Sequence, residues 1–185
     1  EGIKIVSSDD PIAEDVWNTS IQLLAIKPQQ LSLLEGKIFN FDNPNTSSRP
    51  LLISVLAGVT LKRLQKVFPS HACVRSVPNI PVLVGAGLTG LALAEGVTEK
   101  QRLSVMKIFN PISEVFELPE VQLDAFLALT SSGPAYVSLM VEALADGAVA
   151  AGLPRYLAHR LAHRMVSGTA LFLNEKELHP GELKD

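Results

Sequence analysis

The chain has 185 residues, of which 47% are hydrophobic, and a formal net charge of −3. This length and composition are typical of a soluble globular protein with one large or two small domains. The basic residues are scattered, and their densest group, Arg155, Arg160 and Arg164, is expected to be an exposed helix face, so we predict no nucleic-acid partner. No apolar stretch is long enough to span a bilayer, so we predict no membrane partner either.

The cysteine content and the two ends of the chain bear on the cellular compartment. The single cysteine, Cys73, excludes an internal disulfide framework and favours a reducing compartment. No signal or transit peptide is recognisable, and the sequence therefore predicts a cytoplasmic protein. Because the chain starts at Glu1 without a methionine and stops at Asp185 within charged sequence, we expect the gene product to be longer at both ends.

The first two thirds of the chain predict a parallel sheet with helices on both faces. Residues 21–26 and 51–57 are nearly continuous apolar runs of strand length, which indicates strands that are covered on both sides. Further strands are expected at residues 3–6, 73–77, 88–94 and 113–118. Helices are expected at residues 28–35, 60–67 and 98–109. Thr60 and Thr98 are their predicted N-caps, and Gln101 completes a capping box with Thr98.

Two irregular segments interrupt this α/β pattern. Residues 40–50 are too rich in Pro, Asn and Ser for regular structure and are predicted to form a surface loop. Residues 78–81, Pro-Asn-Ile-Pro, are predicted to form a rigid turn that is not helical, because proline fixes its own φ and restricts the residue before it.

After Pro119 the strand signals end and long helices are predicted at residues 121–129, 131–152 and 154–173. In the middle helix Ser131 and Ser132 are the expected N-caps, and Gly152 and Pro154 the expected end. Its surface is apolar on nearly all sides, so it should be largely buried. We therefore predict two domains, an α/β domain over residues 1–118 and a helical domain over residues 119–185.

Motifs for several kinds of chemistry are missing from the sequence. It has no Gly-x-Gly-x-x-Gly after a strand, no Walker loop, no His-Glu-x-x-His and no cysteine cluster. His159 and His163 stand four residues apart without a third ligand nearby, so we predict no metal site. Ligands of open parallel sheets bind beyond the carboxyl ends of the strands, which directs attention to the turns after residues 21–26 and 51–57.

Six blocks, in this order, resemble pyrroline-5-carboxylate reductase from about Ile21 to the end of the chain. They are A-I-K-P-Q (25–29), I-S-V-L-A-G-V-T (53–60), V-P-N-I-P (77–81), L-D-A-F-L-A-L-T-S-S-G-P-A-Y-V (123–137), E-A-L-A-D-G-A-V-A-A-G-L-P (142–154) and H-P-G-E-L-K-D (179–185). The resemblance implies reduction of 1-pyrroline-5-carboxylate to L-proline, the last step of proline biosynthesis, by a hydride from NADPH or NADH. It also implies a Rossmann-like dinucleotide-binding domain followed by an all-α dimerisation domain, both incomplete here, and a dimer or a multiple of dimers.

The resemblance also assigns individual residues. Ala25, Ile26, Lys27 and Pro28 match the turn along the cofactor's ribose and pyrophosphate, and Val55, Leu56 and Ala57 match the strand end near the nicotinamide ribose. Asn79 lies in a turn that approaches the cofactor, with Ile80 in place of the family's threonine. Glu177 and Ser132 are candidate substrate contacts. The main substrate loop of the family, Ser-Pro-Gly-Gly-Thr, would follow Asp185, so no catalytic residue is assigned within the chain.

Two alternatives to this enzyme remain open from the sequence. The chain could be a catalytically silent relative or a dimerisation fragment, in which the upstream glycine-rich fingerprint and the downstream substrate loop are truly absent. It could also be another imine or β-hydroxyacid reductase of similar layout, although the S-G-P-A-Y and H-P-G-E-L-K-D blocks argue against this.

Overall fold

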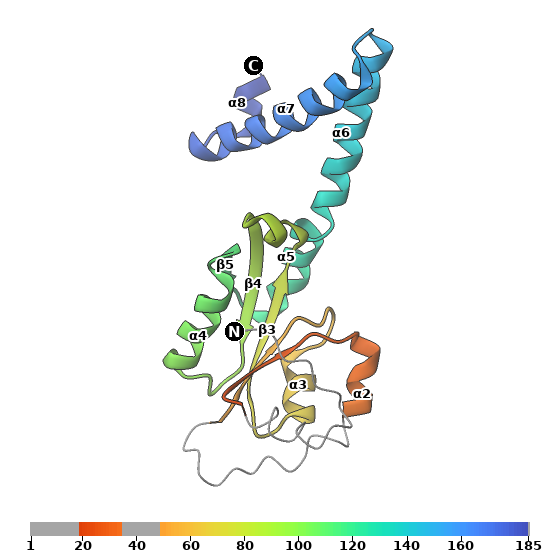
Figure 1. Cartoon of the computed structure of the whole chain (residues 1–185). Helices are drawn as coiled ribbons and strands as arrows, with labels where there is room; N and C mark the ends of the chain where they lie inside the picture. The colour runs from red at the N-terminus through yellow and green to blue at the C-terminus, as the bar shows by residue number, and fades with distance from the viewer. Residues whose placement is uncertain (1–18, 35–48, 185) are drawn as a thin grey trace, which may run out of the picture. The chain divides into compact units, whose positions relative to one another are not determined.

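The computed structural model describes residues 19–34 and 49–184. Two compact units follow each other along the chain and divide between Ser131 and Ser132 (Figure 1). The strand predicted at residues 3–6 and most of the loop predicted at 40–50 lie outside the described residues. The domain boundary predicted between residues 118 and 119 stays a prediction.

The described residues of the first unit form a five-stranded sheet in the order β1-β2-β3-β4-β5. Its strands are β1 (Ile21–Leu24), β2 (Leu51–Ser54), β3 (Ala72–Pro78), β4 (Gly87–Leu93) and β5 (Ser113–Glu117). Neighbouring strands are parallel except β3 and β4, which pair antiparallel. The sheet is therefore mostly parallel, as predicted, with one antiparallel pair that the sequence analysis did not anticipate. Only the eight residues 79–86 join β3 to β4, too few for the crossover that a parallel pair needs.

The helices of this unit begin largely where local sequence signals place them. They are η1 (Pro28–Gln30), α2 (Leu31–Leu34), α3 (Leu61–Val67), η2 (Ile80–Val84), α4 (Glu99–Phe109), η3 (Glu120–Gln122) and α5 (Leu123–Thr130). Thr60 accepts a hydrogen bond from Arg63 N, and Thr98 and Gln101 form the predicted capping box. The non-helical turn predicted at residues 78–81 is wrong in part, since η2 begins at Ile80 with a proline in its first turn, where the missing N–H is tolerated.

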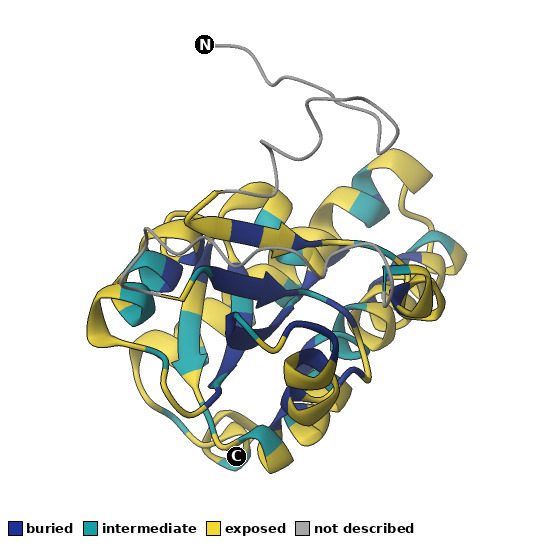
Figure 2. Ribbon diagram, turned by 90° about the horizontal axis from the view of Figure 1, so that it is seen from below, coloured by how far each residue is buried: buried dark blue, intermediate teal, exposed yellow. Residues whose placement is uncertain are grey.

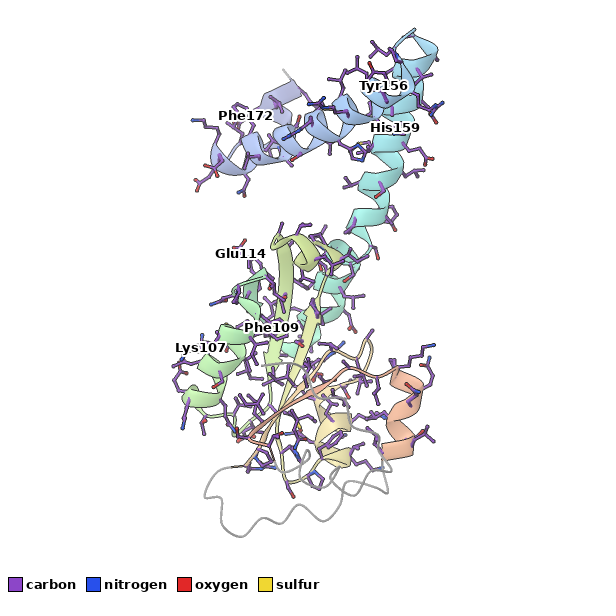
Figure 3. All side chains as sticks on the ribbon, in the orientation of Figure 1. Lys107, Phe109, Glu114, Tyr156, His159 and Phe172 are labelled. Carbon is purple, nitrogen blue, oxygen red and sulfur yellow. The ribbon has the colours of Figure 1, made fainter. Side chains whose placement is uncertain are left out.

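Helices cover both faces of the sheet, as predicted. On one face Leu52, Cys73 and Ala92 pack into a core with side chains of α2, α3 and α5. On the other face Ile53 and Val74 pack with residues of α4. The buried residues lie along the strands and the inner sides of the helices (Figure 2). In α4, Phe109 is buried toward the sheet whereas Lys107 is exposed (Figure 3).

Strand β1 was predicted to be buried on both faces, but it is buried on only one. Its pattern alternates, with Gln22 and Leu24 buried and Ile21 and Leu23 exposed. All four residues of β2 are buried, as predicted. The difference follows from position, because the core around α4 includes no side chain of β1, whereas β2 lies inside the sheet.

The second unit consists of α6 (Gly133–Ala150), α7 (Arg155–Glu175) and α8 (Pro180–Lys184). The connection after α6 is a Schellman motif: Gly152 N donates to Val149 O, Leu153 N donates to Ala148 O, and Gly152 has φ +105°, which suits glycine. The end predicted at Gly152 is thus confirmed. Tyr156 and Phe172 stand near opposite ends of α7 (Figure 3).

The predicted serine caps of α6 are wrong. Ser131 and Ser132 both have helical dihedrals, and Ser132 makes no side-chain cap hydrogen bond. Helix α5 ends at Thr130, so these two residues form the short connection between α5 and α6. They lack the extended backbone that a side-chain cap needs.

Helices α6 and α7 pack through small residues and leave much apolar surface uncovered. Their shared core consists of Val141, Ala145, Ala158 and Ala162, and Arg155 Nη1 donates to Asp146 Oδ1 at 2.7 Å. Within α6 only Val141 and Ala145 are buried. The extensive burial predicted for this helix is therefore not supplied within one chain.

Candidate functional site

The carboxyl ends of β1, β2 and β3 meet at one edge of the sheet. Their register places Leu24 beside Ser54 and Ser54 beside Arg75. Val55 N donates to Leu24 O at 3.1 Å, so the turn after β2 starts directly beside the turn after β1. The three predicted cofactor segments therefore emerge from the same edge, where open α/β sheets bind their ligands.

The turn after β1 is exposed and held by its own hydrogen bonds. Lys27 precedes η1 with an extended backbone, and Pro28 occupies the first position of that short helix. Lys27 N donates to Gln30 Oε1 at 3.1 Å, and Gln30 N donates to Lys27 O at 2.8 Å. Ala25 is exposed and Ile26 is half-buried. The turn thus presents backbone and the Lys27 ammonium at the sheet edge.

The turn after β2 divides its residues between core and surface. Leu56 is buried in the core beneath α3, whereas Ala57 is exposed and Val55 is half-buried. Leu56 N donates to Ser54 Oγ at 3.3 Å. Only the backbone of Leu56 could face a ligand, while the small Ala57 leaves the turn accessible.

Asn79 uses its side chain to hold the protein together. Its Oδ1 accepts from Leu88 N at 2.8 Å, and its Nδ2 donates to Thr130 O at 3.0 Å. The residue is only 7% exposed. Both functional atoms of the amide are engaged, so a cofactor contact at this position would fall to the backbone. The neighbouring Ile80 is exposed.

The sequence analysis missed a charge network around a buried arginine. Arg75 of β3, whose side chain is 3% exposed, binds Glu120 Oε1 through Nη1 at 3.4 Å and Asp124 Oδ1 through Nη2 at 2.9 Å. Glu120 Oε1 also accepts from Leu61 N, the first residue of α3, at 2.6 Å. The sequence did carry a signal for this network. A lone arginine inside an apolar strand needs carboxylate partners, and two carboxylates four residues apart were available to pair with it.

The two candidate substrate residues lie in the helical unit. Ser132 is half-buried at the start of α6. Glu177 follows α7 with φ +51°, a left-handed backbone that is uncommon outside glycine. Its N–H donates to Asn174 O, and Leu178 N donates to Leu173 O, which makes this end a second Schellman motif. Both assignments stay proposals.

Other polar groups are explained by packing. In the part of the chain that the structure describes, no three His, Cys, Asp or Glu side chains gather as a metal site. His163 Nδ1 lies 2.7 Å from His159 O. Burial raises the pKa of Cys73 to about 11, so this thiol is not a nucleophile near neutral pH. No helix among the described residues is long and apolar enough to cross a bilayer.

Comparisons with known families and sequences converge. Residues 120–185 match the model of the pyrroline-5-carboxylate reductase dimerisation family. A pyrroline-5-carboxylate reductase of Synechocystis sp. is 46% identical over 180 residues, which cover 97% of the chain and 65% of the relative. The enzyme of Glycine max is 36% identical over 184 residues, again 65% of the relative. The chain thus spans slightly less than two thirds of the length of these relatives.

Solved structures give the same result. A pyrroline-5-carboxylate reductase from Coxiella burnetii superposes with a TM-score of 0.79 at 31% identity, covering 92% of this chain and 63% of that one. Pyrroline carboxylate reductase of Plasmodium falciparum, solved with NADP bound, superposes with a TM-score of 0.77 at 30% identity, covering 88% and 63%. The first unit therefore has the Rossmann-like fold of these enzymes, and the second unit has the fold of the family's dimerisation domain.

Proposed function

Since this chain belongs to the pyrroline-5-carboxylate reductase family, we propose that it is part of an enzyme that reduces 1-pyrroline-5-carboxylate to L-proline with a hydride from NADPH or NADH. One observation of the chain itself carries the proposal. The Val55 N to Leu24 O hydrogen bond places the turns after β1 and β2 side by side at the carboxyl edge of the sheet. Two of the three segments expected to bind the cofactor thereby lie side by side.

The residues at this edge fit a dinucleotide. The exposed Lys27 supplies a positive charge for a phosphate, and the small Ala57 leaves room for a ligand close to the backbone. Asn79 fixes its own turn through two hydrogen bonds, which keeps that backbone in place. In this proposal residues 25–28 run along the ribose and pyrophosphate, and residues 55–57 lie by the nicotinamide ribose.

When bound, the nicotinamide supplies the hydride, and the residues of this chain position the substrate against it. A cyclic imine is protonated readily in water, so the reaction asks little acid–base catalysis of the protein. The requirement is to hold the C=N bond against the nicotinamide face. Ser132 and Glu177 are the proposed substrate contacts within this chain, and the main substrate loop is proposed to follow Asp185.

We also propose an assembly and a compartment for this protein. The match of residues 120–185 to a dimerisation family supports self-association, as a dimer or a multiple of dimers, through the apolar surfaces of α6 and α7. A cytoplasmic location is supported by the single cysteine, which is buried and leaves no partner for an internal disulfide.

The test measures NADPH oxidation by the intact protein. The oxidation is monitored as the loss of NADPH fluorescence after addition of 1-pyrroline-5-carboxylate. We expect substrate-dependent turnover by the intact protein and none by the 185-residue segment alone, because the segment lacks the proposed substrate loop. Turnover by the bare segment would show that the active site is misplaced. An intact protein that binds no NADPH and turns over no substrate would instead favour a silent relative.

A further inference from the structure

We propose that Glu120 is a positioning residue for the cofactor-binding turn after β2. This inference rests on the proposed function, because that function assigns residues 55–57 to the cofactor. Glu120 lies in η3, 59 positions along the chain from the group it holds. Its carboxylate connects the segment that precedes α5 to the start of α3.

The turn after β2 is held at both ends. At its beginning, Val55 N donates to Leu24 O, which fixes the chain to β1. After its end, Leu61 N donates to Glu120 Oε1 at 2.6 Å. Leu61 N is one of the backbone groups at a helix start that have no partner within the helix. Glu120 therefore fixes the point at which the turn becomes α3, and so limits how residues 55–58 can shift.

Arg75 holds the Glu120 carboxylate in place. The guanidinium extends from β3, is almost fully buried, and lies 3.4 Å from the same Oε1 atom that accepts from Leu61 N. Arg75 Nε has no hydrogen-bond partner within the described ranges. The two paired carboxylates therefore stabilise the buried positive charge. A buried guanidinium that loses a carboxylate is costly, and this pairing therefore opposes displacement of Glu120.

Asp124 provides a matched comparison within the same network. It accepts from Arg75 Nη2 at 2.9 Å, but its side chain is 81% exposed and, within the described part of the chain, it makes no hydrogen bond to α3. Both carboxylates neutralise the same arginine, but of the two only Glu120 also binds the start of α3, which follows the turn assigned to the cofactor. If Glu120 were merely structural, the two residues would affect cofactor binding in proportion to their effects on stability.

The experiment compares Glu120→Ala with Asp124→Ala in the intact protein, measuring the Kd of NADPH by fluorescence titration and Tm by calorimetry. We expect Glu120→Ala to raise the Kd about tenfold, since it removes the charged hydrogen-bond acceptor that fixes the start of α3 directly after the turn. We expect Asp124→Ala to lower Tm while leaving the Kd within about twofold, which is less than the value of one neutral hydrogen bond.

Glu120→Gln separates the hydrogen bond from the charge and covers the case in which Glu120→Ala does not fold. Its amide oxygen can still accept from Leu61 N, so we expect a Kd near that of the unchanged protein despite a lower Tm. Equal Kd changes for Glu120→Ala and Asp124→Ala would overturn the proposal, as would a Glu120→Gln variant as weak as Glu120→Ala. Failure of the unchanged intact protein to bind NADPH would overturn the proposed function, and this inference with it.

Discussion

His71 is a buried imidazole directly before the interior strand β3. It is 3% exposed, its Nε2 lies 3.2 Å from Gln22 Oε1, and its Nδ1 has no hydrogen-bond partner within the described residues. Burial, and secondarily the charge of Arg49, lowers the pKa of His71 below its ordinary value. The folded protein therefore keeps this ring neutral at pH values where the unfolded chain protonates it.

This difference predicts a loss of stability in mild acid. Below about pH 6.5 the unfolded state binds more protons at His71 than the folded state, so the free energy of unfolding must fall as the pH falls. We expect urea midpoints to drop between pH 7 and pH 5 by less in His71→Gln than in the unchanged protein. Equal drops would contradict the assignment, whatever the absolute stability of the variant.

Glu177 predicts a stabilising substitution. Its left-handed backbone at the end of α7 is about 1 kcal/mol less favourable for a residue with a side chain than for glycine. Glu177→Gly should raise the guanidinium midpoint, whereas Glu175→Gly, inside the last turn of the same helix, should lower it. A lower midpoint for Glu177→Gly would show that its side chain contributes contacts that outweigh the strain.

At the scale of elements, the packing of α5 on β4 depends on Gly90. A Cβ at this position would lie 2.8 Å from Phe126 Cδ1 and 2.9 Å from Leu123 Cδ2. Gly90→Ala should therefore destabilise the protein by about 1–3 kcal/mol, measured by chemical unfolding. Combining it with Phe126→Leu makes room for the added methyl group, so the double variant should lose less than the sum of the two single variants. Additive losses would exclude the clash with Phe126 as the cause.

The elements that sequence predicted well are those with local signals. Thr98 and Gln101 define the start of α4 within four positions of sequence, and Thr60 does the same for α3. The antiparallel direction of β4 was missed because apolar periodicity does not indicate the direction of a strand. The short connection over residues 79–86 is the feature that determines it. The serine caps were predicted wrongly because α5 ends at Thr130 and the next two residues keep helical dihedrals.

The candidate site was less predictable than the fold. The strand-end turns were found from the sequence, since the rule for parallel sheets needs only strand order. The role of Asn79 was not, because its partner Thr130 lies 51 positions away. Arg75 and Glu120 are 45 positions apart. Such polar pairs are set by how elements pack, which a single sequence does not state.

For the whole molecule, the exposed apolar side chains of α6 predict its assembly. Leu139 is 65% exposed and lies away from the core shared by α6 and α7. If this surface forms a subunit interface, a charge there would be buried without a partner. Leu139→Asp should convert the assembly to smaller species in light scattering of the intact protein. Leu103→Asp, at an exposed apolar position of α4, should leave the mass unchanged; equal effects would argue against a specific interface.

The antiparallel pairing of β3 and β4 also bears on the order in which the first unit assembles. Joining these strands closes a short loop, whereas joining β1 to β2 must close the longer segment between Leu24 and Leu51. The entropy lost on closure grows with loop length, so the β3–β4 pair is the less costly one to form early. Arg75 and Asn79 both belong to that part of the chain. The anchors for the distant Glu120 and Thr130 can thus exist before their partners arrive, and α5 can dock onto a surface that is already formed.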